Sequence, residues 1–235
     1  MKPLAVSRRL PPKAYCLLPI MKAVVFDMDG LIFNTEDVYT LVGTELLRRR
    51  GCEFTPELKN EMMGLIPQTA FEIMIRRCNL CESWRELAAE SNILFIGLLD
   101  QHLAPMPGLL DLLDALEAAG IPKAIATSSA RALLDACLAR FGMHRRFRFF
   151  LTAEDIARGK PDPEIYLTAA ARFDLNPGEL LVLEDSQNGC KAAAAAGAFT
   201  VAVPARHSRT HDFSSASLVV ENLSDPRLYK VLGLK

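Results

Sequence analysis

Short apolar runs alternate with longer segments whose apolar positions recur at helical spacing over most of the chain. The first run, Val24-Val25-Phe26, is β-branched and aromatic, which is typical of a buried strand. Strands that alternate with helices predict a parallel, doubly wound sheet and therefore an α/β fold. The pattern predicts further strands over 124–127, 149–152, 180–183, 199–203 and 218–220. It predicts helices over 109–119, 131–141 and 163–173, and a further helix that carries Ala192–Ala196 and stops at Gly197.

A second pattern interrupts this alternation between Glu36 and about Asp100. Apolar residues recur there at helical spacing without any strand-like run, which predicts roughly four helices. The breaks between them fall at 51, 55–56, 64–67 and 79–83, where turn-forming residues gather. Pro105-Met106-Pro107-Gly108 marks the return to the alternating pattern. We therefore expect an α/β core formed by 21–35 and 105–235, with a helical domain over 36–104 inserted between its first two strands.

The first twenty residues are basic and contain no acidic residue, a composition that targeting segments share. They lack a clear apolar stretch and a small-residue cleavage site, and Met21 directly precedes the first strand. We expect residues 1–20 to be a disordered extension or an over-called start.

Composition argues against several classes of protein. The 235 residues carry a formal net charge of -1, which argues against nucleic-acid binding through a broad basic surface. No apolar run is long enough to cross a bilayer. The six cysteines are scattered, as in reduced cytosolic proteins, and Cys78 and Cys81 lack the further ligands of a zinc site. We expect a cytoplasmic protein, a monomer or weak oligomer, that binds neither nucleic acid nor membrane.

Two carboxylates end the first predicted strand, in the run Asp27-Met28-Asp29-Gly30. Side chains two residues apart on an extended chain point the same way, so Asp27 and Asp29 should converge at the carboxyl end of the strand. Ligands of open α/β sheets bind at that end. Two like charges held together there suggest a divalent metal, and the metal suggests a phosphate.

Further polar residues follow other predicted strands, and a lysine precedes a predicted helix. In a parallel sheet the carboxyl ends of the strands share one edge, so these side chains should meet Asp27 and Asp29 in one crevice. Taken singly, each group has an ordinary interpretation as a turn, a helix cap or a solvated side chain. The further candidates are Thr127, Ser128, Ser129, Lys160, Glu184 and Asp185.

Together these residues suit phosphoryl transfer. Asp27 would attack phosphorus to form an aspartyl-phosphate, and Asp29 would protonate the leaving oxygen and then activate water. Thr127 and the hydroxyls of Ser128 and Ser129 would bind phosphoryl oxygens, while Lys160 would offset negative charge. The metal would be Mg²⁺, a hard ion that takes oxygen ligands. Glu184 and Asp185 would hold it together with the carboxylates of the first strand.

These residues resemble the four motifs of the haloacid dehalogenase superfamily, and the helical insert resembles its β-phosphoglucomutase and sugar-phosphatase branch. The motifs are Phe26-Asp27-Met28-Asp29-Gly30, Thr127, Gly159-Lys160-Pro161-Asp162-Pro163 and Glu184-Asp185-Ser186. The resemblance implies a Rossmann-like core, an aspartate nucleophile at Asp27 and an acid/base at Asp29. It also implies Mg²⁺ held by Asp27, the Asp29 carbonyl and Asp185, with Glu184 as a further candidate, and a mobile helical cap.

Departures from the family pattern bear on the reaction. Family phosphomutases hold a second phosphate with basic cap residues, but the stretch Met62–Gln68 contains neither lysine nor arginine, and the mutase histidine falls on Tyr39. These departures favour hydrolysis of a small phosphorylated metabolite, a sugar or nucleoside phosphate, over a phosphosugar mutase. A phosphoacceptor signalling domain would lack the helical insert, and a non-catalytic binding protein would not need every catalytic position filled.

Overall fold

The computed structural model describes residues 21–234, so the expectation for residues 1–20 falls outside the described residues. A sheet of parallel strands in the order β3-β2-β1-β4-β5-β6 forms its centre. This order confirms the predicted doubly wound α/β class, because β2 and β3 lie on one side of β1 and β4 to β6 lie on the other. The strands are β1 (Ala23–Phe26), β2 (Lys123–Ala126), β3 (Phe150–Leu151), β4 (Leu180–Glu184), β5 (Phe199–Ala202) and β6 (Leu218–Val219).

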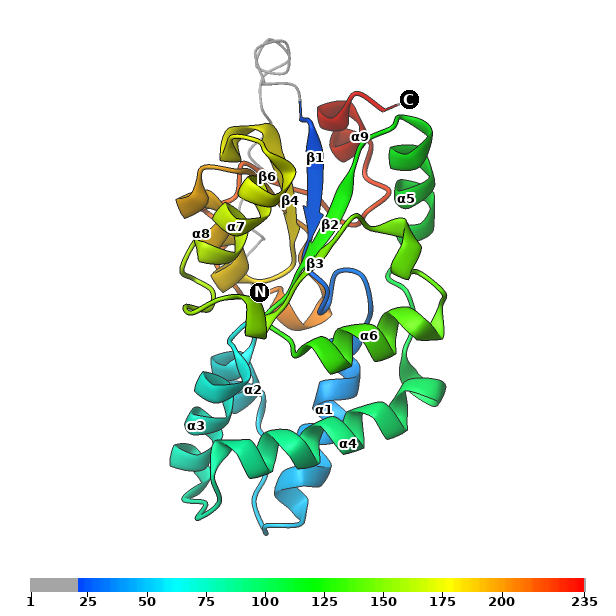
Figure 1. Cartoon of the computed structure of the whole chain (residues 1–235). Coiled ribbons are helices and arrows are strands. Elements are labelled where there is room, and N and C mark those ends of the chain that lie inside the picture. The colour runs from blue at the N-terminus through cyan, green and yellow to red at the C-terminus, as the bar shows by residue number, and fades with distance from the viewer. Residues whose placement is uncertain (1–20, 235) are drawn as a thin grey trace.

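Helices cover both faces of the sheet (Figure 1). Alternate residues of β1 face opposite layers, with Val24 and Phe26 in one apolar cluster and Ala23 and Val25 in the other. The first cluster includes leucines of α5 (Leu109–Ala118) and α6 (Arg131–Arg140), together with α9 (Pro226–Leu232). The second includes α7 (Glu164–Phe173) and the alanines of α8 (Gln187–Ala196). Both faces of β1 are buried, which explains its continuous apolar run.

Four helices separate β1 from the rest of the core, as the sequence predicts. They are α1 (Thr35–Arg48), α2 (Pro56–Met62), α3 (Pro67–Cys78) and α4 (Trp84–His102). We call them the helical insert; Figure 1 shows it as a body beyond the carboxyl ends of the strands. It has its own apolar cluster, to which Leu46, Met74 and Leu87 contribute. A capping box between Ser83 and Glu86 starts α4.

Two helical segments differ from the prediction. Helix α8 begins at Gln187, earlier than the alanine run indicates, because the Ser186 hydroxyl accepts a hydrogen bond from the Gly189 amide and caps it. Helix α9 was not predicted, although Asp225 caps it and Pro226 starts it. Its short apolar pattern gives little periodic signal, and its Leu228 is buried against the core.

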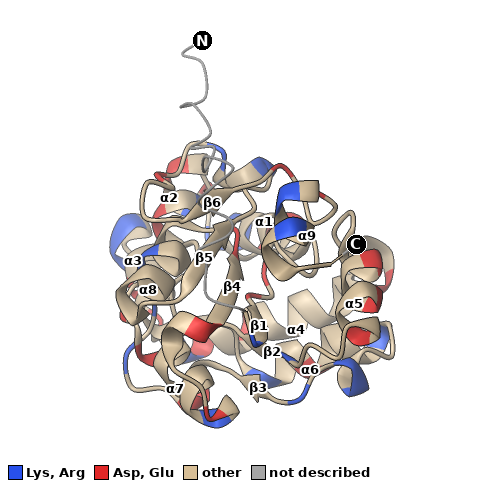
Figure 2. Ribbon diagram, turned by 90° about the horizontal axis from the view of Figure 1, so that it is seen from above, with Lys and Arg blue, Asp and Glu red and all other residues tan. Residues whose placement is uncertain are grey.

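Charged residues of both signs are spread over the fold, in line with the formal net charge of -1. Figure 2 shows acidic and basic residues interspersed over the helices and loops in that view. Within residues 21–234, no helix combines the length and the apolar character that a bilayer crossing requires.

Candidate active site

The parallel register brings the predicted strand-end residues to one edge of the sheet. Phe26 in β1 pairs with Ile125 in β2 and with Leu183 in β4. The first two positions after these paired residues therefore lie side by side at the carboxyl edge. They are occupied by Asp27, Thr127, Glu184 and Asp185, each of which is buried.

Lys160 reaches this edge from the loop before α7 and is almost completely buried. Its Nζ donates hydrogen bonds to Asp27 Oδ1 at 2.5 Å, Glu184 Oε1 at 2.6 Å and the Ala126 carbonyl at 3.1 Å. Burial by itself would lower the pKa of Lys160, but the charges of Asp27 and Glu184 hold that pKa above its ordinary value. Lys160 is therefore a fixed cation shared between two carboxylates.

Three carboxylates converge beside this lysine. Oxygens of Asp27, Glu184 and Asp185 lie within 4.8 Å of one another. Burial, reinforced by the neighbouring carboxylates, raises the pKa of Asp27 and of Asp185 well above the ordinary value. One ammonium group cannot compensate three buried carboxylates.

Asp185 has a carboxylate oxygen that receives no hydrogen bond from the described part of the chain. Its Oδ2 atom is buried and has no hydrogen-bond partner among the described residues. Gly30 makes room for this oxygen, because a Cβ atom at position 30 would overlap Asp185 Oδ2, and its φ of 73° is in the left-handed region. A buried oxygen without a donor, inside an acidic cluster, fits a hard divalent cation that takes oxygen ligands.

Asp29 is held by hydroxyl groups rather than by the lysine. Its Oδ2 accepts hydrogen bonds from Thr127 Oγ1 at 2.9 Å and Ser129 Oγ at 2.8 Å. Its Oδ1 is buried without a partner among the described residues. Burial raises the pKa of Asp29, although the hydroxyl hydrogen bonds oppose this effect. A carboxyl group with a raised pKa and one unpaired oxygen is suited to carrying a proton.

Tyr39 joins this hydroxyl network from the helical insert. Its hydroxyl lies 3.0 Å from Ser129 Oγ, and its ring packs against Phe95 with ring centroids 4.6 Å apart. Burial raises the pKa of Tyr39 well above the ordinary value, and the nearby Asp29 charge adds to the effect. Tyr39 is therefore neutral and linked to Asp29 through one hydroxyl.

The α2–α3 connection is held against the sheet edge by side chains of the core, which donate hydrogen bonds to its backbone carbonyls. Ser128 Oγ donates to the Gly64 carbonyl at 3.1 Å, and Asn188 Nδ2 donates to the Met63 carbonyl at 3.4 Å. The Ser128 hydroxyl, expected at the phosphate, is thus bonded to the insert in this structure.

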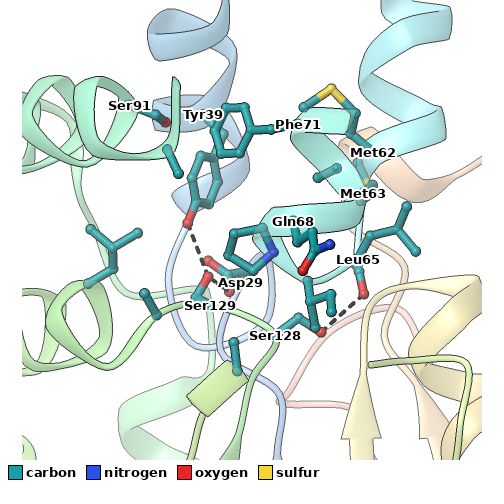
Figure 3. A pocket seen from close by; sticks show the side chains of 18 of the residues that line it. Asp29, Tyr39, Met62, Met63, Leu65, Gln68, Phe71, Ser91, Ser128 and Ser129 are labelled. Carbon is teal, nitrogen blue, oxygen red and sulfur yellow. Dashed lines mark hydrogen bonds between the residues drawn. The ribbon is translucent and has the colours of Figure 1, made fainter. Parts of the chain in front are cut away.

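A cavity of about 510 Å³ lies between the insert and the core. Asp27, Asp29 and Asp185 line its core end, so the acidic cluster opens into it. Figure 3 shows Asp29, Ser128 and Ser129 on the core side, with Tyr39 and Phe71 on the insert side. Its size is typical of pockets that hold a small organic molecule.

Three residues position Glu184: Ser186, which belongs to the fourth motif, and Tyr166 and Gly189, which lie outside the motifs. Tyr166 donates to Glu184 Oε1 at 2.5 Å, while the Ser186 amide and hydroxyl donate to Oε2. Gly189 lies so close that a Cβ atom there would overlap the Glu184 carboxylate. Every oxygen of Glu184 is thus engaged by the protein, and the predicted metal role of this residue stays a prediction. The sequence around Tyr166 does not indicate this role, because a tyrosine in an apolar helix is usually a core residue.

Comparison with known proteins extends this picture. The family model described as haloacid dehalogenase-like hydrolase matches residues 24–203. The chain belongs to the haloacid dehalogenase-like hydrolases. It is similar to a probable pseudouridine-5'-phosphatase of Drosophila melanogaster, with 34% identity over 86% of this chain and 89% of the relative. It is also similar to a beta-phosphoglucomutase of Bacillus subtilis, with 29% identity over 87% of this chain and 91% of the relative.

Coverage and structural likeness differ among the relatives. The chain spans 56% of the length of a bifunctional riboflavin kinase/FMN phosphatase of Arabidopsis thaliana, to which it is 30% identical over 91% of its own length. The crystal structure of CbbY from Rhodobacter sphaeroides in complex with xylulose-(1,5)bisphosphate shares its fold. That match has a TM-score of 0.81 and 24% identity, and it covers 87% of this chain and 96% of the other.

These findings confirm the resemblance to the β-phosphoglucomutase and sugar-phosphatase branch of the haloacid dehalogenase superfamily. Within the helical insert, the position of the expected mutase histidine is occupied by Tyr39, whose hydroxyl is bonded to Ser129. Lys59 is the one basic side chain among the described residues that line the cavity. This haloacid dehalogenase-like hydrolase therefore offers little positive charge at the insert end of its site.

Proposed function

We propose that the protein is a Mg²⁺-dependent phosphatase that hydrolyses a small phosphorylated metabolite through an aspartyl-phosphate intermediate. The observation that carries this proposal is the buried acidic cluster of Asp27, Glu184 and Asp185, with Lys160 beside it, at the core end of the cavity. The family assignment and the relatives named as phosphatases support the same reaction class.

In this proposal Asp27 is the nucleophile. Lys160 opposes the rise in the Asp27 pKa that burial causes, and it aligns the carboxylate by donating to one oxygen at 2.5 Å. The ammonium group also offsets negative charge that gathers on the transferring phosphoryl group. The bond from Asp27 oxygen to phosphorus forms as the bond from phosphorus to the substrate oxygen breaks.

Asp29 acts as the general acid and then as the general base. Its carboxyl group protonates the leaving oxygen in the first step and, now ionised, accepts a proton from the water that hydrolyses the phosphorylated Asp27. Thr127 and Ser129 hold Asp29 for this task through its Oδ2, leaving Oδ1 for the moving proton. The products are the free alcohol and inorganic phosphate.

Asp27 and Asp185 would hold the metal ion, with the Asp29 carbonyl and Glu184 as the further ligands that the family resemblance implies. The unpartnered Asp185 Oδ2 supports this assignment. When bound, Mg²⁺ supplies positive charge that screens the phosphate from the carboxylates. Thr127, Ser128, Ser129 and Lys160 are proposed to bind the phosphate.

We further propose that residues 36–104 act as a cap over a core of 21–35 and 105–235. The cavity between them would then open and close as the contacts of Gly64 and Tyr39 with the core break and form. The mutase reaction is less well supported, because a bisphosphate intermediate needs cations at the cap end. A monomeric or weakly oligomeric state and a cytoplasmic location stay predictions.

The test uses a small activated substrate, acetyl phosphate, and three variants. Asp27→Asn should lower turnover at least about 10³-fold, whereas Asp100→Asn, a change at a highly exposed carboxylate, should leave it unchanged. Asp29→Asn should let phosphorylated protein accumulate, because water is no longer activated, and acid quenching followed by mass spectrometry would detect it. Undiminished turnover by Asp27→Asn would refute the assignment. Interconversion of isomeric sugar phosphates would favour the mutase.

A further inference from the structure

We propose that the substrate is a monophosphate ester whose alcohol carries an apolar group of ring size, and that polyol phosphates and bisphosphates are poor substrates. This inference rests on the proposed phosphatase function and concerns the same cavity. It follows from the contrast between the two ends of the cavity. The core end holds the carboxylates, and the insert end is built largely from apolar side chains.

Apolar residues from three helices of the insert and from the α2–α3 connection line the far end. Met62 and Leu65 line it before α3, Phe71 comes from α3 and Trp84 from the start of α4. Figure 3 shows Met62, Leu65 and Phe71 around the pocket. Burial of such surfaces by an apolar substrate group is favourable, whereas each sugar hydroxyl left there without a partner would weaken binding.

Tyr39 forms a fixed wall whose one hydroxyl hydrogen is already donated. Its hydroxyl is engaged with Ser129, and Phe95 supports its ring. Apart from the ion pair of Glu36 and Lys59, the insert contributes few other polar side chains to the cavity, namely Gln68, Ser91 and Asn92. Of these, Gln68 donates to Glu72 at 2.9 Å. A polyol would therefore find few donors and acceptors at this end.

The positive charge at the insert end is already paired with an acidic side chain of the insert. Lys59 is the one basic residue among the described residues lining the cavity. Its Nζ donates to Thr40 Oγ1 at 2.6 Å and to the Glu36 carbonyl at 2.8 Å, and lies 3.2 Å from the Glu36 carboxylate. An ammonium group has three donors, and these three partners use them all. A second phosphate would displace Lys59 from its counterion or remain uncompensated.

The experiment compares esters that share a phosphate on a primary alcohol, so that the leaving oxygens at that position are similar. Benzyl phosphate carries an apolar ring, glycerol 3-phosphate and glucose 6-phosphate carry hydroxyls, and glucose 1,6-bisphosphate adds a second phosphate. We expect kcat/KM for benzyl phosphate to exceed the other three by at least about tenfold, the scale on which apolar pockets discriminate. Acetyl phosphate, which has no group long enough to fill the insert end, reports separately on the core chemistry.

Variants tie this preference to the cavity wall. Phe71→Ala should lower the ratio of kcat/KM for benzyl phosphate to that for glycerol 3-phosphate by at least about fivefold, since it removes a ring-sized apolar contact. Phe71→Leu is the alternative if the alanine variant does not fold, with a smaller drop in the same ratio. Ile93→Ala is the matched control: Ile93 lies on α4 with 73% of its surface exposed, outside the cavity lining, and should keep the ratio.

The outcomes separate the two proposals. Hydrolysis of acetyl phosphate with equal or faster turnover of the polyol phosphates or the bisphosphate overturns the substrate inference and leaves the phosphatase function standing. Hydrolysis of acetyl phosphate without any ester turnover also overturns the substrate inference. Failure to hydrolyse acetyl phosphate in the presence of Mg²⁺ refutes the phosphatase function itself.

Discussion

Gly189→Ala should damage the active site indirectly, by displacing the carboxylate of Glu184. Gly189 lies in the first turn of α8, directly beside the Glu184 carboxylate. A Cβ atom at this position would approach Glu184 to well under 3.0 Å, a separation that real Cβ atoms essentially never show. The Glu184 side chain must therefore move, because the neighbouring helix backbone is the less yielding part.

The cost follows from what Glu184 would lose. Its Oε1 accepts from Lys160 at 2.6 Å and Tyr166 at 2.5 Å, its Oε2 accepts from Ser186, and the side chain is completely buried. Disrupting a buried ion pair on one side costs about 3–5 kcal/mol. Alanine is favoured over glycine in a helix by about 1 kcal/mol, which offsets part of this cost. We expect a net destabilisation of about 2–4 kcal/mol, which lowers Tm by roughly 5–15 °C in a chain of this size.

Activity should fall with stability, because Lys160 loses one of the two carboxylates that fix it beside Asp27. The assays are thermal unfolding and acetyl phosphate turnover at a temperature where the variant is folded, with at least about a tenfold loss of kcat expected. Gly97→Ala in α4 is the control: a Cβ there meets no atom within 4 Å, so it should gain up to about 1 kcal/mol and keep kcat. If Gly189→Ala matched that control in both stability and kcat, the argument from Glu184 would be wrong.

Three further predictions concern charge. Lys59→Met should cost about 3 kcal/mol in urea unfolding by leaving Glu36 buried without a counterion, and the double variant with Glu36→Gln should recover most of that loss. Mg²⁺ at 100 times its Kd should stabilise the protein by about 2.7 kcal/mol, and Asp185→Asn should remove this effect; equal stabilisation of the variant would contradict the proposed site. The pKa of Glu117 is lowered to about 2, chiefly by hydrogen bonds from Arg146, so its folded-state pKa lies below its unfolded one. Its contribution is present above the ordinary carboxyl pKa and is lost as pH falls from about 4.5 to about 2. Glu117→Gln should therefore cost up to about 1 kcal/mol at pH 7, the carboxylate being partly exposed, and the difference from the parent should disappear in thermal scans near pH 2.

The group of residues at the carboxyl edge of the sheet could be predicted from the sequence, because it depends only on the strands running parallel. Once the strands around Val24, Ile125 and Val182 are parallel, the residues that follow them must meet. The four helices of the insert were predictable for a similar reason, since Gly, Pro and capping residues separate clear helical patterns. Neither inference needs knowledge of which side chains touch.

The sequence does not predict which side chains form hydrogen bonds with one another in the site. Tyr39 and Ser129 are 90 residues apart, and only the packing of α1 on the core brings the two hydroxyls together. Tyr166 and Glu184 likewise meet because α7 lies across the sheet, although neither residue's sequence context distinguishes it from a core residue or a turn. Composition and spacing identify the chemistry of a strand end, but tertiary packing decides which oxygen each donor reaches.

The two ends of the cavity therefore perform separable tasks. At the core end, three buried carboxylates face one lysine, which leaves an excess of negative charge. A bound divalent cation would reduce that excess and would also attract the phosphate of the substrate. At the insert end, Lys59 is neutralised by Glu36, and apolar side chains dominate the wall. Changes at the core end should alter turnover of every phosphate ester by a common factor, because all esters share the reacting group. Changes at Phe71 should instead alter the ratio between esters, because only the alcohol reaches that wall.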